Sequence, residues 1–103
     1  KNLKPWFMTL GYPVIEEHYN DLMAASHPRD RTIRPQVVTK EANPNYHSLI
    51  SHFESITGRG VILNTSFNLH GEPIVYSAKD AVRVFLKSGL NYLALDNYLL
   101  KKI

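Results

Sequence analysis

The feature that most constrains the fold is one amphipathic stretch with strong start and stop signals. It begins at Asn43-Pro44, because an Asn side chain caps a helix well and proline suits the first helical position. It ends at Gly58, since glycine readily adopts the left-handed conformation that closes helices. The pattern predicts a helix whose apolar stripe consists of Tyr46, Leu49, Ile50, Phe53 and Ile56.

Two further helices are predicted on either side of this one. The first covers about 14–25, where the apolar residues at 14, 15, 22 and 23 share one face and Pro13 suits the start. The other opens with Ser77 and Asp80 in the spacing of a capping box, and Gly89 closes it. Its buried stripe is expected to consist of Ala81, Val82, Phe85 and Leu86.

Short apolar runs predict the strands. They lie at 6–10, 36–39, 61–63, 92–95 and 98–100, and the turn Asp96-Asn97 joins the last two. Alternation of strands and helices predicts an α/β (α+β) fold in which three helices pack on a twisted mixed sheet. In such folds ligands usually bind at the connections that lead from a strand to the following helix. The longest such connection here runs from Val61 to Ser77.

Length and composition favour one modest domain. The sequence has 103 residues, of which 44% are hydrophobic and 20% charged, which excludes a disordered tail or a collagen-like repeat. It has no cysteine, which excludes a disulfide, a thiolate nucleophile and a Cys-based zinc site. A net charge of +3 is too small to indicate a nucleic-acid-binding protein. No signal peptide is visible, so we expect a cytoplasmic protein. The sequence starts with Lys1 and not with methionine, so we expect it to be a piece of a longer protein.

The segment from Asn64 to Asn68 concentrates polar side chains at the end of an apolar run. It offers two amides and two hydroxyls, which can donate hydrogen bonds to phosphate or carbamoyl oxygens. The alternative interpretation is a turn in which these side chains only satisfy their own backbone. Spacing alone leaves both interpretations open.

Three arginines, at positions 29, 31 and 34, lie on an irregular loop. Guanidinium groups pair well with phosphate and carboxylate, although a solvated basic loop is the plainer interpretation. Arg34 lies between Ile33 and Pro35, so we expect it to be partly packed, with Asp30 as an internal partner. The histidine spacings predict no metal site in this chain, since His47 and His52 fall on different sides of one helix.

Several of these segments together resemble a known family. Arg34-Pro35-Gln36, the Asn64–Asn68 segment and the run Gly71-Glu72-Pro73-Ile74-Val75 are similar to the C-terminal region of the nodulation-type O-carbamoyltransferases. The likeness runs from about Pro5 to Lys102. It implies a parent enzyme with two parts. An N-terminal ATPase-like part holds a metal ion and transfers a carbamoyl group to a hydroxyl, and a C-terminal YrdC-like part joins carbamoyl phosphate and ATP into carbamoyl-adenylate.

By this resemblance the chain is a partial YrdC-like domain, inactive in isolation, that works in cis with the N-terminal part. Arg34 would be the catalytic and substrate-binding cation at the phosphate or carbamoyl end, and Asn64 and Ser66 would hydrogen-bond the adenylate. No nucleophile is needed, because such a site works by positioning and charge stabilisation. The residues expected to support these ligand-binding side chains are Gln36, Thr65, Asn68 and Glu72.

Two alternative functions stay open. The first is a mildly basic module that binds nucleic acid, because YrdC-like folds have been associated with RNA. The basic residues are scattered along the chain, which disfavours this alternative. A structural or dimerising module without catalytic role is the other, and the sequence leaves a homodimer open. We expect no association with a membrane, because the longest apolar runs have four or five residues and are too short to span a bilayer.

Overall fold

The structure of the protein is a computed structural model, and it describes residues 4–103. The chain forms two compact units, one up to Leu63 and one from Asn64 to Ile103. The predicted α+β class is confirmed. The described residues contain three α-helices, and their strands form two antiparallel pairs, β1–β2 and β3–β4, where one mixed sheet was expected. The α-helices are α1 (Tyr19–Leu22), α2 (Pro44–Thr57) and α3 (Ala78–Lys87).

The first unit begins with a broken helical segment. The helix predicted over 14–25 is present as α1 between two 3-10 turns, η1 (Glu16–His18) and η2 (Met23–Ala25). The backbone leaves helical geometry at His18 and Leu22, where ψ is 1° and 2°, and no side chain caps any of the three segments. The short pair β1 (Tyr12–Pro13) and β2 (Thr32–Ile33) brackets this segment, with Tyr12 opposite Ile33.

Arg31 joins β2 to the helical turns. Its Nη1 donates to both carboxylate oxygens of Glu16 at 2.8 Å, and its guanidinium lies 4.5 Å from the centre of the Tyr19 ring. The hydrogen bonds from Arg31 to Glu16 raise the pKa of Arg31 above its usual value. The backbone of Arg31 is left-handed, with φ of 52°, which is uncommon for a residue with a side chain.

The predicted helix from Asn43-Pro44 to Gly58 is confirmed as α2. The Asn43 side chain accepts a hydrogen bond from the backbone N–H of Tyr46 at 3.0 Å, and Pro44 occupies the first helical position. Gly58 ends the helix with φ of 75° and donates its N–H to Glu54 O at 2.7 Å. No residue of α2 is buried by the part of the chain that the structure describes, so its apolar stripe lies largely open to solvent.

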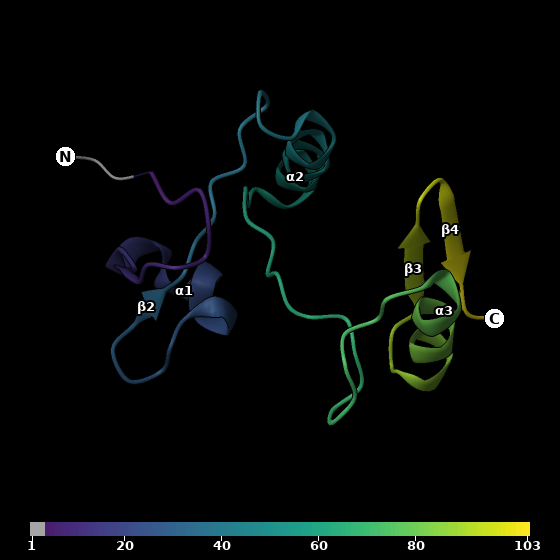
Figure 1. Ribbon diagram of the computed structural model, residues 1–103. Coiled ribbons are helices and arrows are strands. Elements are labelled where there is room, and N and C mark those ends of the chain that lie inside the picture. The colour runs from purple at the N-terminus through teal and green to yellow at the C-terminus, as the bar shows by residue number, and fades with distance from the viewer. Residues whose placement is uncertain (1–3) are drawn as a thin grey trace. The chain divides into compact units, whose positions relative to one another are not determined.

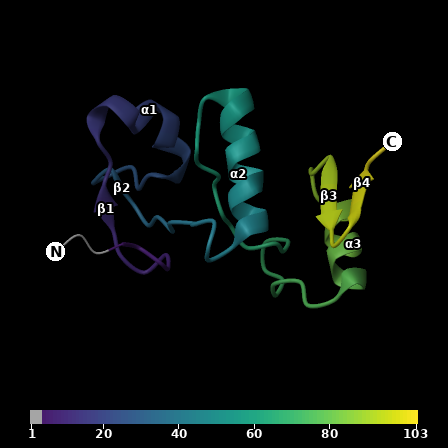
Figure 2. The ribbon, with the colours of Figure 1, turned by 90° about the horizontal axis from the view of Figure 1, so that it is seen from above.

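The second unit holds the core. α3 covers one face of the hairpin formed by β3 (Tyr92–Leu95) and β4 (Tyr98–Lys101), as both ribbon views show (Figures 1 and 2). The predicted capping box at Ser77 and the predicted hairpin are both confirmed. The buried cluster consists of Ala81, Phe85 and Leu93, against which Phe67, Val75, Val82, Leu95 and Leu100 pack.

The strands predicted at 6–10, 36–39 and 61–63 are wrong. None of these segments pairs with another strand among residues 4–103. The first folds into a turn in which Thr9 N–H bonds Phe7 O at 2.8 Å. The second makes two separate backbone bonds, from Val37 N–H to Pro5 O and from Asn43 N–H to Thr39 O. A short apolar run forms a strand only where a neighbouring segment supplies its backbone hydrogen bonds, and no described segment pairs with these runs as a strand. Within the described residues, no helix combines the length and the apolar character needed to cross a bilayer.

Candidate functional site

The polar segment Asn64-Thr65-Ser66 opens the second unit. All three side chains are exposed, and they directly precede Phe67, whose ring packs against the core of that unit. The amide and hydroxyl groups of this segment therefore stand at the surface, next to an anchored position. Such groups can donate to the oxygens of an anionic ligand.

The following loop, residues 67–75, closes on itself. Val75 N–H bonds Phe67 O at 3.1 Å, and the Asn68 amide donates to Glu72 O at 2.8 Å and to Leu69 O at 3.2 Å. Gly71 allows the turn with φ of 82°, a conformation that other residues rarely adopt. The Asn68 amide therefore bonds the backbone of its own loop. The turn interpretation of the Asn64–Asn68 segment predicts this kind of bond for its side chains.

The same loop is fastened to α3 by an ion pair. Glu72 Oε2 lies 2.7 Å from Nη1 of Arg83, and both side chains are partly buried. The sequence predicts a supporting role for Glu72 and no role for Arg83. A single arginine in an amphipathic helix carries no sequence signal for its partner, because the partner depends on how the loop folds back.

Arg34 follows β2 in the first unit and is exposed, so the expectation that it is partly packed is wrong. Its proposed partner Asp30 instead accepts from the backbone and hydroxyl of Thr32, at 3.0 and 2.8 Å, and lies 3.4 Å from His27 Nδ1. The hydrogen bonds from Thr32 hold the pKa of Asp30 below its usual value. Among residues 4–103 no carboxylate forms an ion pair with Arg34. Its guanidinium is therefore available to an external anion.

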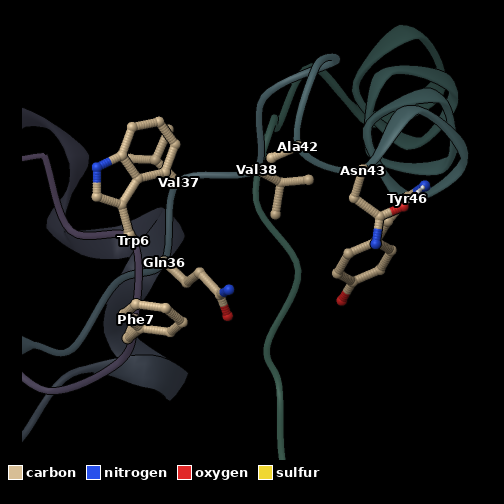
Figure 3. A pocket seen from close by; sticks show the side chains of 8 residues that line it. All are labelled: Trp6, Phe7, Gln36, Val37, Val38, Ala42, Asn43 and Tyr46. Carbon is tan, nitrogen blue, oxygen red and sulfur yellow. Dashed lines mark hydrogen bonds between the residues drawn. The ribbon is translucent and has the colours of Figure 1, made fainter.

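Gln36 lies two residues further on and lines a hollow of about 390 Å³. Its amide extends into the space between Phe7 and Tyr46 (Figure 3). The hollow was missed from the sequence, because it unites segments far apart in the chain and none of them carries a motif. Its lining consists of Trp6, Phe7, Gln36, Val37, Val38, Ala42, Asn43 and Tyr46.

The expected site residues thus form two groups, each within one unit. Arg34 and Gln36 follow β2 in the first unit, and the second group follows directly after that unit ends at Leu63. No set of three or more His, Asp or Glu side chains suited to a metal ion occurs within residues 4–103. The second group consists of Asn64, Thr65, Ser66, Asn68 and Glu72.

Comparison with known proteins identifies relatives across nearly the whole chain. The protein MJ1058 of Methanocaldococcus jannaschii is 38% identical over 102 residues, which are 99% of this chain and 17% of that protein. The nodulation protein NolNO of Sinorhizobium fredii is 44% identical over 96 residues, covering 93% of this chain and 14% of NolNO.

A named carbamoyltransferase is also similar. The 3'-hydroxymethylcephem-O-carbamoyltransferase of Streptomyces clavuligerus is 41% identical over 54 residues, covering 52% of this chain and 10% of the enzyme. The chain spans less than a fifth of the length of the curated relatives it matches. Residues 1–102 match the family described as Carbamoyltransferase C-terminus. The resemblance drawn from the sequence motifs is thereby confirmed, and the chain belongs to the carbamoyltransferase C-terminus family.

Proposed function

We propose that this chain is the C-terminal part of an O-carbamoyltransferase and contributes to forming and binding carbamoyl-adenylate from carbamoyl phosphate and ATP. The observation that carries the proposal is the exposed Arg34 guanidinium, which forms no ion pair with the described carboxylates. A guanidinium fork matches phosphate oxygens in geometry and charge. The name of the Streptomyces relative, an O-carbamoyltransferase, supports the same reaction class.

The proposed chemistry needs no nucleophile from the protein. Hydrolysis of carbamoyl phosphate supplies carbamate and releases phosphate. A carbamate oxygen then attacks the α-phosphorus of ATP, and the bond to the β-phosphate breaks as pyrophosphate leaves. Arg34 would offset the negative charge that gathers on the reacting oxygens, and Asn64 and Ser66 would orient the adenylate by hydrogen bonds. Gln36 would support Arg34 in the first unit, and Thr65, Asn68 and Glu72 would support Asn64 and Ser66 in the second.

Transfer of the carbamoyl group to a hydroxyl is assigned to an N-terminal ATPase-like part, acting in cis. That part would also supply the metal ion, and this chain would have no activity in isolation. The relatives leave room for such a part, since each extends far beyond the region matched here.

The test separates adenylate formation from transfer. Carbamoyl-phosphate-dependent exchange of radioactive pyrophosphate into ATP is measured in the whole protein that carries this chain. We expect Arg34→Ala and Ser66→Ala each to lower the exchange rate on the order of 100-fold, the usual effect of losing one stabilising donor. Arg29→Ala is the matched control, because Arg29 is exposed on the loop before β2 and forms no described ion pair. Undiminished exchange in both site variants would contradict the assignment.

A further inference from the structure

The Glu72–Arg83 ion pair connects a loop to a rigid helix. The two charged atoms, Oε2 and Nη1, lie 2.7 Å apart, with the side chains 33% and 40% exposed. The Oε2 atom itself is shielded from solvent and accepts no hydrogen bond from residues 4–103. The Arg83 guanidinium is therefore the charge that compensates this shielded oxygen, and its loss would leave the carboxylate poorly solvated.

Arg83 stands on α3, a helix that is anchored by its buried residues. Its neighbours on α3, Val84 and Phe85, are 1% and 3% exposed, and the capping box fixes the start of the helix. Glu72, by contrast, belongs to the 67–75 loop and is held by local backbone contacts. Its N–H bonds Leu69 O at 2.9 Å, and its carbonyl accepts the Asn68 amide at 2.8 Å.

These contacts lead from Arg83 to the proposed adenylate site. Arg83 fixes Glu72, and the backbone bond between Val75 and Phe67 closes the loop that Glu72 belongs to. Phe67 directly follows Ser66, so this loop fixes the residue next to the Ser66 hydroxyl. A displacement of about 1 Å at such a group can lower a rate 100-fold.

We propose that Arg83 is a positioning residue for carbamoyl-adenylate formation, acting through Glu72 and the 67–75 loop on Ser66. This inference rests on the proposed function of the site. Arg83 touches neither the ligand nor the reacting atoms in this assignment. Its effect comes from holding a loop that carries the hydrogen-bonding side chains.

The test uses pyrophosphate exchange in the whole protein, at a temperature below the unfolding transition of every variant. We expect Arg83→Gln and Glu72→Gln each to lower the exchange rate roughly 10- to 100-fold, as loss of a supporting contact does. Arg83→Lys keeps the charge and should retain more of the rate. Lys87→Gln is the control, because Lys87 is an exposed cation in the last turn of the same helix and pairs with no described carboxylate.

A double variant distinguishes positioning from general stability. If Arg83 acts through Ser66, adding Arg83→Gln to Ser66→Ala lowers the rate little further, whereas independent effects multiply. Multiplying effects, or an unchanged rate in Arg83→Gln, would overturn the inference. If Arg83→Gln does not fold, the comparison is made with Glu72→Gln, which removes the same ion pair and for which the same two outcomes apply. Undiminished exchange in both Arg34→Ala and Ser66→Ala contradicts the proposed function itself, so the two failures are distinguishable.

Discussion

The Ser77 hydroxyl and the Asp80 carboxylate lie 2.6 Å apart, Oγ to Oδ2, and together close the start of α3. Asp80 N–H donates to Ser77 Oγ at 3.2 Å, and Ser77 N–H donates to Asp80 Oδ2 at 3.1 Å. Two backbone donors that the helix leaves unpaired are thus satisfied reciprocally.

Replacing Ser77 by alanine should destabilise the protein by about 1 kcal/mol, because an N-cap hydrogen bond is lost. The measurement is the free energy of unfolding from urea titration. Ser48→Ala serves as control, since Ser48 is exposed within α2 and its hydroxyl caps nothing. Equal stability of the two variants would show that the cap contributes nothing.

The capping box also predicts a pH dependence. The hydrogen bonds from Ser77 hold the pKa of Asp80 below its usual value of 3.8. Because the folded-state pKa is lowered, this stabilisation is present above the unfolded-state pKa and is lost as the pH falls through the folded-state pKa. The stability difference between the wild type and Asp80→Asn should therefore be present near neutral pH and shrink as the pH falls below the usual pKa of 3.8. A difference that does not change with pH would contradict the prediction.

Neighbouring residues of α3 should respond very differently to truncation. Phe85 is 3% exposed in the core cluster, so Phe85→Ala should destabilise the protein by about 3–5 kcal/mol. Leu86 is 66% exposed, and Leu86→Ala should change stability by less than about 0.5 kcal/mol. Thermal unfolding followed by circular dichroism compares the two. Similar losses would mean that Leu86 is covered by something outside the described chain.

Two glycines test backbone conformation without steric conflict. A Cβ atom added at Gly58 or at Gly89 would meet no atom within 4 Å, but only Gly58 has a left-handed backbone, with φ of 75°. Gly58→Ala should therefore destabilise the protein by about 1 kcal/mol, and Gly89→Ala should be neutral or slightly stabilising. Urea unfolding of both variants measures the difference. A destabilising Gly89→Ala would show that the reason lies elsewhere than in the sign of φ.

Elements with local signals could be predicted from the sequence. The cap at Asn43, the stop at Gly58, the capping box at Ser77 and the turn at Asp96-Asn97 each depend on residues within one or two turns of chain. The predicted strand at 61–63 failed for the opposite reason. Its apolar side chains fit a strand, but pairing needs a distant partner, and Ile62 is 40% exposed among the described residues.

The same distinction between local signals and distant contacts applies to the candidate site. Asn64 and Ser66 could be proposed from the sequence as site residues, because several polar groups adjoin one another directly there. The pairing of Glu72 with Arg83 was not, since it joins a loop to a helix that begins after the loop ends. The wrong partner predicted for Arg34 has a local cause. Asp30 is satisfied by Thr32, two residues away, and a nearby donor requires less ordering of the chain than a distant one.

At Arg31 the backbone and the side chain favour different amino acids. A φ of 52° favours glycine or asparagine, whereas the contacts to Glu16 and Tyr19 require a long, planar cation. Glycine would relax the main chain and lose both contacts, and lysine would keep a charge but lose the planar group that stacks on the ring. No one of the twenty amino acids is optimal for both, so arginine keeps its two contacts here at a cost in backbone conformation.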